Sequence, residues 1–530
     1  MESKRYKGLL LTAILTFAAT GAHAQVLSTE ITVDRTVHPE LSSASPLPTV
    51  KPDVLRPSMA DNTLSPEEFG GPVLFGALPD TATAYLADGL PAKSPYRCYA
   101  TAAYGPVYRL ALQGGLSLVD SRRTFLGGEA HFYGMNYHNH AAGEKTDVRS
   151  NVAGFSGQFI QNVLGHRINV RAAYDHVAAH SVLASSWIHR NSAIVDGSIT
   201  RTAGRYEYGG RLTLDHLYGT LADLKLDGAL RSDDGHWGGA LGLEYGRMYG
   251  AGIFSFTPAL LFDGGALSLR LGARLNAASG TGSHKFGVAP SANLTWRPNS
   301  LFTAYAKAGG STAFNSYRRA FNYSPLISLH AVEDVNRTPL DAEIGLRGGG
   351  QTGFRIGLRG GYSKCEDMIM AAYVPAYQET AMAGYDMENI WGEVSAGYTA
   401  RKFGLSVDAS VRMNSTGEDK GSADNMDRAK YIVKVEAKAQ PLEKLSLELG
   451  YTLRTHRRVY VYGRQLIPGA GAEYIDLHNS SDLHFSAAYK VSRHLDLGLR
   501  GENLLNRRSD ILPFLDCPPA TVLLSGTVRF

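Results

Sequence analysis

Apolar and polar residues alternate along much of this chain with a period of two. In segment 267–276 every odd-numbered residue is leucine or alanine, while the even-numbered residues include Arg270 and Arg274. Successive side chains of a β-strand point to opposite faces, whereas a helix would mix the two sets. The alternation predicts strands most clearly over five segments: 222–231, 267–276, 431–439, 445–454 and 521–530.

The alternating pattern recurs from about residue 96 to the end of the chain without a linker-like change in composition. A soluble β-sandwich also alternates, but one such domain uses about 100 residues. Strands of about 10 residues, joined by short turns at one end and longer loops at the other, are typical of outer-membrane barrels. We therefore predict an all-β fold, a transmembrane antiparallel β-barrel of about 22 strands over residues 95–530. Its apolar face should meet lipid and its polar face the lumen.

Turn residues separate the alternating segments, and the lengths of the connections predict which end of the barrel is periplasmic and which is extracellular. Pro, Asn, Ser and Gly between alternating runs mark tight turns, which belong on the periplasmic side. These predicted turns are 297–300, 439–442 and 491–494. Longer polar stretches predict extracellular loops at 314–338, 414–427 and 463–473.

The first residues differ from the rest. Lys4, Arg5 and Lys7 precede the apolar stretch 9–19, and small residues follow at Ala22 and Ala24. This order predicts a secretory signal peptide over residues 1–24, because the apolar stretch is too short for a spanning helix. Residues 25–94 contain many prolines in polar sequence, which predicts a largely irregular periplasmic tail.

Composition argues against several functions. The net charge of +4 is small for 530 residues and gives no support to nucleic-acid binding. Cys98, Cys365 and Cys517 are too scattered for zinc spacing or a disulfide framework, and either one disulfide or three free thiols stays open. The His-Asn-His run at 138–140 lies between alternating strands without neighbouring metal ligands. The sequence therefore predicts neither an enzyme nor a metal or cofactor site.

Charged residues on the polar faces of the alternating segments are candidates for side chains that face the lumen. They carry both signs, which is expected of any polar barrel interior, whereas a selective pore would show a ring of one sign. The candidates are Arg270, Arg274, Lys434, Glu436, Lys438, Glu448, Arg500 and Glu502.

The C-terminal stretch carries a resemblance to a known family. Segment 495–502 alternates, the chain closes on the aromatic Phe530, and a four-residue motif follows the segment, formed by Asn503, Leu504, Leu505 and Asn506. This resembles the last two strands of TonB-dependent receptors, where the penultimate strand leads into Asn-Leu-(Leu/Phe)-(Asn/Asp) and the last strand ends in an aromatic residue. The resemblance implies a receptor barrel in the outer membrane, with Phe530 as its signal to the barrel-insertion machinery.

Residues 25–94 depart from that family. Its members carry a globular plug domain before the barrel and a TonB box at the start of the mature chain. Here the segment is shorter than such a domain and too rich in proline to form one. Residues 30–33 are the only match to a TonB box that we identify, and four residues of this kind also occur by chance. The chain thus resembles barrel-only relatives of these receptors, which are frequent in Bacteroidota, and engagement of TonB stays open.

Two functions fit this description. The first is receptor-like transport of a solute across the outer membrane by a barrel without its own plug domain. The second is a structural or assembly subunit that anchors a surface lipoprotein or a periplasmic partner in an outer-membrane complex. Outer-membrane lipid and the barrel-insertion machinery are expected partners in both cases, and nucleic acid in neither.

Overall fold

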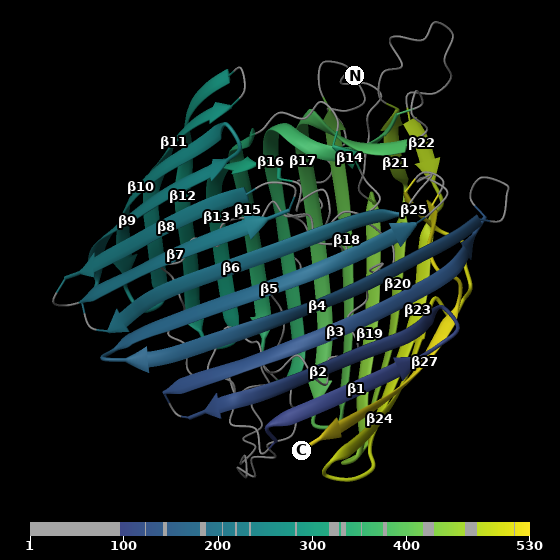
Figure 1. Cartoon of the computed structure of the whole chain (residues 1–530). Coiled ribbons are helices and arrows are strands. Elements are labelled where there is room, and N and C mark those ends of the chain that lie inside the picture. Colours follow the sequence, from purple (N-terminus) through teal and green to yellow (C-terminus); the bar gives the residue numbers. More distant parts are fainter. Residues whose placement is uncertain are drawn as a thin grey trace, which may run out of the picture. The chain divides into compact units, whose positions relative to one another are not determined.

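The structure is a computed structural model in which every regular element of the described part is a β-strand (Figure 1). It describes residues 96–530 apart from 122, 141–145, 181–186, 204, 218–219, 233–234, 281–282, 317–327, 330–334, 351, 375–378, 417–428, 462–473 and 513–514. The predicted signal peptide and Pro-rich tail lie outside the described residues. Within the described ranges, no helix has both the length and the apolar character needed to span a membrane.

The wall of the barrel consists of long strands, and a few short strands lie in the connections. The wall strands are β1 (Cys98–Tyr104), β2 (Tyr108–Asp120), β3 (Thr124–Asn139), β4 (Thr146–Val163), β5 (His166–His180), β6 (Ile188–Ala203), β7 (Tyr206–His216), β8 (Thr220–Arg231), β9 (Trp237–Met248), β10 (Ala251–Asp263), β11 (Leu267–Gly280), β12 (Ser283–Asn299), β13 (Phe302–Phe314), β15 (Val335–Gly349), β16 (Gly353–Val374), β17 (Glu379–Ala400), β18 (Phe403–Thr416), β19 (Tyr431–Leu442), β20 (Leu445–Thr455), β23 (Ser480–Lys490), β24 (Leu495–Glu502) and β27 (Thr521–Arg529). The short strands are β14 (Ser328–Leu329), β21 (Arg457–Val461), β22 (Tyr474–Leu477), β25 (Asp510–Leu512) and β26 (Leu515–Asp516).

The wall closes on itself. Each of its 22 strands pairs antiparallel with the next, and β27 returns to pair with β1. The carbonyl of Phe530 accepts hydrogen bonds from the N–H groups of Arg97 (2.9 Å) and Cys98 (2.7 Å) at this seam. Closure leaves no sheet edge with unpaired backbone groups, which a membrane requires. The predicted fold class and strand number are confirmed.

The connections differ between the two ends of the barrel. Short turns, such as 164–165 between β4 and β5, gather at the end that holds Phe530. Residues 463–473 and most of the predicted loops 314–338 and 414–427 lie outside the described residues. The strands that flank them, β13 and β15, β18 and β19, and β21 and β22, meet these gaps at the opposite end of the barrel. In outer-membrane barrels the short turns are periplasmic and the long loops extracellular.

Two of the three predicted tight turns are displaced along the chain. Residues 491–494 join β23 to β24 as predicted, but the other turns lie at 300–301 and 443–444. The Asn299 side chain accepts hydrogen bonds from the N–H groups of Leu301 and Phe302. These bonds place the turn after Pro298, whereas the prediction included this proline in the turn. In β19 the register shifts between Ala439 and Leu442, so the strand continues past the proline between them through an irregularity.

The two faces of the wall differ in exposure, as the alternation predicts. In β11 the apolar Leu271 is 50% exposed, while Arg270 beside it is only 6% exposed. Leucine is the commonest of the exposed large hydrophobic residues, and examples on another strand are Leu260 and Phe254 of β10. Apolar side chains that face outward and polar side chains that pack inward are the reverse of a soluble domain and suit a wall surrounded by lipid.

The wall is taller on one side than on the other. β16 and β17 contain 22 residues each, whereas β7 contains 11. The additional length lies at the end with the long loops, where β14 pairs in parallel with β17 and β21 pairs in parallel with β16. These short strands add to the sheet beside β16 and β17 at this end of the wall (Figure 1).

Glycine makes room for large side chains that lie flat along the wall. A Cβ on Gly345 would stand 2.4 Å from the Tyr305 ring, which crosses that position to reach the carboxylate of Glu343. Only glycine lets the ring approach the backbone this closely, so the aromatic side chain covers the strand instead of projecting from it.

Candidate functional site

Two of the predicted lumen residues, Arg270 and Arg274, lie on β11 and are buried. Arg274 contacts the carboxylate of Glu244 on β9 and donates to the side-chain oxygen of Asn276 (3.2 Å). Ser255 on β10 donates to the same oxygen (2.7 Å). The Arg274 cluster therefore ties three neighbouring strands together, and a truncated side chain here would leave buried polar groups without partners.

The other predicted lumen residues form separate groups. The ammonium of Lys438 on β19 lies 3.3 Å from Glu448 on β20 and 3.8 Å from Glu436. On β24 the guanidinium of Arg500 lies 2.8 Å from Glu502. Lys434 lies on β19, four residues before Lys438. The candidates thus occupy three places on the wall (β11, β19–β20 and β24) instead of one shared site.

A further charged group lies on β13 to β17, and sequence reasoning gave Arg359 as a lumen-facing charge without its partners. Arg359 of β16 binds both carboxylate oxygens of Glu393 on β17, at 2.9 and 2.6 Å, and its guanidinium stacks over the ring of Trp391. Tyr305 and Glu343 lie beside it on β13 and β15. These contacts depend on which residues face each other across strands, and the sequence does not contain that register. The Arg359–Glu393 ion pair and the Trp391 ring give this part of the wall a polar surface.

The connection between β24 and β27, residues 503–520, folds into a unit that we call the seam loop. It contains the β25–β26 hairpin and leads into β27, which closes the barrel against β1. The motif that carried the family resemblance forms its base. Asn503 and Asn506 both adopt φ of 47°, a left-handed conformation that Asn tolerates better than most residues. Their side chains bind the loop backbone, Asn503 to Pro518 O (2.9 Å) and Asn506 to Ala520 N (3.0 Å).

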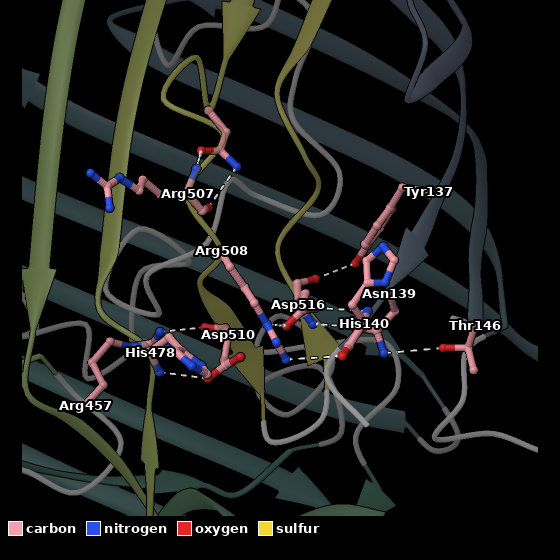
Figure 2. Close-up of polar contacts among 11 residues, drawn as sticks. Tyr137, Asn139, His140, Thr146, Arg457, His478, Arg507, Arg508, Asp510 and Asp516 are labelled. Carbon is pink, nitrogen blue, oxygen red and sulfur yellow. Dashed lines mark hydrogen bonds and ion pairs between the residues drawn. The ribbon is translucent and has the colours of Figure 1, made fainter. Parts of the chain in front are cut away.

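Asp516 attaches one side of the seam loop to the end of β3 (Figure 2). Its carboxylate accepts hydrogen bonds from the N–H of His140 (3.0 Å) and from Arg508 (3.0 Å). Its carbonyl accepts from the Tyr137 hydroxyl (2.8 Å), and its N–H donates to the Asn139 side chain (2.8 Å). Asp516, Tyr137 and Asn139 are buried, and charge-assisted bonds in such a place are strong.

Arg457 and His478 attach the other side to β21 and the end of β22 (Figure 2). Arg457 donates to the carbonyls of Asp510 (2.5 Å) and Ile511 (3.3 Å). The Asp510 carboxylate accepts from the N–H of His478 (2.7 Å) and contacts its ring Nδ1 (2.8 Å). Strands β23, β24, β27, β1 and β2 lie between the two attachments, so the seam loop bridges the closure of the barrel.

The three cysteines are free thiols, and the first histidine of the 138–140 run is paired with an aspartate. The described structure contains Cys98, Cys365 and Cys517 as free thiols. Burial raises the pKa of the Cys517 thiol, which lies in the seam loop, to about 11, so it stays protonated and unreactive at neutral pH. His138 pairs with Asp147 at 2.7 Å. Among the described residues, no group of three His, Cys, Asp or Glu side chains is placed to hold a metal ion.

A closed 22-strand antiparallel barrel of this kind is a multi-pass β-barrel of the outer membrane. No protein-family model and no curated protein sequence matches the chain. Solved structures do match in fold. The siderophore receptor PirA from Acinetobacter baumannii has a TM-score of 0.61 at 10% identity, covering 83% of this chain and 81% of its own. The FrpB iron transporter from Neisseria meningitidis has 0.60 at 10%, covering 83% and 82%. The copper transporter OprC has 0.59 at 11%, covering 82% and 80%. At these identities the likeness is one of fold.

We propose that Phe530 has a role in assembly as well as in closure. Its backbone completes the seam, while its ring is exposed, so Phe530→Ala removes the ring and keeps the backbone hydrogen bonds. If the ring is the signal to the insertion machinery, folded protein in the outer membrane of cells should fall several-fold, while purified protein refolds in detergent as before. Heat-modifiable mobility on gels measures both. Val528→Ala, on β27 just before Phe530, is the control, and equal losses in the two variants would contradict the proposal.

Proposed function

We propose that this chain is a receptor-like barrel that transports a solute across the outer membrane. The observation that carries the proposal is the closed 22-strand wall, which aligns with most of the length of proteins named as siderophore receptors and metal transporters. The polar inner wall and the seam loop support it, since a braced loop beside the mouth gives a ligand a fixed surface to bind.

We further propose that the chain has no plug domain of its own. The support is in the sequence, where the Pro-rich residues 25–94 form the only segment between the predicted signal peptide and β1. Proline on this scale prevents regular pairing. A lumen of 22 strands is wide enough to need an occluding element, so either this segment or another protein would close it.

Planar bilayers test both parts of the proposal. Purified full-length protein and a variant that lacks residues 26–90 are inserted under the same conditions, with gel mobility as the control for folding. A quiet full-length barrel and a steady ion current through the shortened one would support transport through a lumen that the segment occludes. Equal conductance of the full-length and shortened proteins would show that residues 26–90 do not occlude the lumen. Silence of both forms would argue against a transport barrel.

The alternative is a structural subunit, which the tall side of the wall favours. There β14, β21 and β22 extend the sheet beyond β16 and β17 and offer a firm surface to a surface lipoprotein. A periplasmic partner would instead meet the short-turn end. Purification under mild detergent distinguishes this alternative, because a scaffold should be recovered in a stoichiometric complex and show no current in bilayers.

A further inference from the structure

Three sulfur-containing side chains form one buried cluster on β16 and β17. Cys365, Met368 and Met387 are 4%, 3% and 2% exposed, and Tyr385 and Tyr474 pack against them. The cluster lies in the halves of β16 and β17 that are nearer the long loops. Three sulfur-containing side chains packed in one cluster are a potential ligand set as well as a packing unit.

A β-bulge brings the three residues to one face. Cys365 and Met387 are direct cross-strand partners, so their side chains share a face. Met368 is three residues beyond Cys365 and would point the other way in a regular strand. The register shifts between Cys365 and Met368, with Asp367 at φ of 55°, and Met368 then pairs with Tyr385. The bulge and the left-handed residue therefore bring the Met368 side chain to the face that carries Cys365 and Met387, as β-bulges do where they re-aim a side chain.

The surroundings of the sulfur atoms are polar. The Thr338 hydroxyl donates to Cys365 Sγ (3.6 Å), and the Asn414 amide donates to Met387 Sδ (3.5 Å). Asn389, two residues along β17, is buried and bonded to a serine hydroxyl. A second buried cluster, around Ile253 and Val335, contains only hydrocarbon side chains, so this barrel builds packing units without sulfur elsewhere.

We propose that Cys365, Met368 and Met387 bind a monovalent soft metal ion of the Cu(I) class. Thiolate and thioether ligands select Cu(I), whereas harder ions prefer carboxylates and imidazoles. Binding converts the Cys365 thiol and Cu(I) into a copper thiolate and releases one proton to solvent. The charges of the thiolate and the ion then cancel, so the buried site carries no net charge. Thr338 and Asn414, which donate hydrogen bonds to Cys365 Sγ and Met387 Sδ, would fix the orientation of these two sulfur atoms. The site goes beyond the proposed function, because it does not depend on which solute is transported.

A Cu(I) titration tests the proposal on the full-length barrel in detergent. The protein competes anaerobically with a chromophoric Cu(I) chelator, and we expect one tightly bound ion and one released proton per chain. Removing an outer-shell partner weakens metal sites by up to roughly 100-fold, so losing a sulfur ligand should weaken binding by at least as much. Cys365→Ser and Met387→Leu remove one sulfur each, and the leucine keeps the packed volume.

Matched controls separate this site from general sulfur binding. Cys98→Ser removes another thiol, and Met413→Leu removes a methionine on neighbouring β18, outside the cluster. Both should bind Cu(I) as the unaltered protein does, with folding verified by gel mobility. The proposal is overturned if the unaltered protein does not compete with the chelator, or if Met387→Leu and Met413→Leu bind Cu(I) equally well. In that case the three sulfurs serve packing alone.

Discussion

Leu226→Arg is expected to destabilise the folded barrel by about 2–4 kcal/mol, the penalty for a basic residue on the lipid face near the middle of the membrane. Leu226 is exposed and lies near the centre of the twelve-residue strand β8, between Gly210 and Leu243 of its neighbours. The Leu226 side chain lies on the apolar face of the strand, which faces outward. The guanidinium of an arginine at this position would therefore enter the hydrocarbon of the membrane. Urea unfolding in lipid vesicles, extrapolated linearly to water, measures the change in the free energy of unfolding.

Lys225→Gln is the matched control, because it alters charge one residue away on the opposite face. Lys225 lies 3.4 Å from Asp223, and both side chains are partly exposed. Such pairs contribute about 0–1 kcal/mol, so the control should unfold almost as the unaltered protein does. If both substitutions change stability by the same amount, the assignment of the two faces is wrong.

The fold could be predicted because its strongest signal is local. Alternation in segment 267–276 identifies a strand and both of its faces without knowledge of any partner strand, and the structure places Leu271 and Arg270 accordingly. Turn positions are less secure, since they depend on single side chains such as Asn299, whose capping contacts override the position of a nearby proline. Local chemistry therefore gives the elements and leaves their ends uncertain by a few residues.

The sites depend on contacts that the sequence does not show. Arg274 meets Glu244 only because β9, β10 and β11 adopt one particular register. Asp516 meets Tyr137 and Asn139 across most of the length of the chain, because the last loop folds toward the third strand. The motif at Asn503 was recognisable by resemblance, but its role as the base of the seam loop follows from its φ and its hydrogen bonds.

Arg457→Met is expected to release the seam loop from β21. Arg457 is 3% exposed, and its guanidinium donates to the carbonyls of Asp510 and Ile511. Without it these buried groups lose a partner, which costs about 1–3 kcal/mol for each group left unsatisfied. A loss of about 2 kcal/mol raises the open population of the loop roughly 30-fold, since each 1.4 kcal/mol is a factor of ten. Trypsin reports this directly, because it cleaves after Arg507 and Arg508 within the loop.

The neighbouring Arg458 provides the control for that experiment. It also lies on β21, but it pairs with the exposed Asp476 (2.8 Å) and stacks on Tyr474 without contacting the loop in any described interaction. Arg458→Met should leave cleavage within the seam loop almost unchanged, since exposed ion pairs contribute little. If the two variants are cleaved at the same rate, Arg457 does not brace the loop. If only Arg457→Met is cleaved faster while the membrane part of the barrel keeps its gel mobility, the seam loop opens independently of the wall. The loop could then admit or release a ligand at the mouth without unfolding the strands that close the barrel.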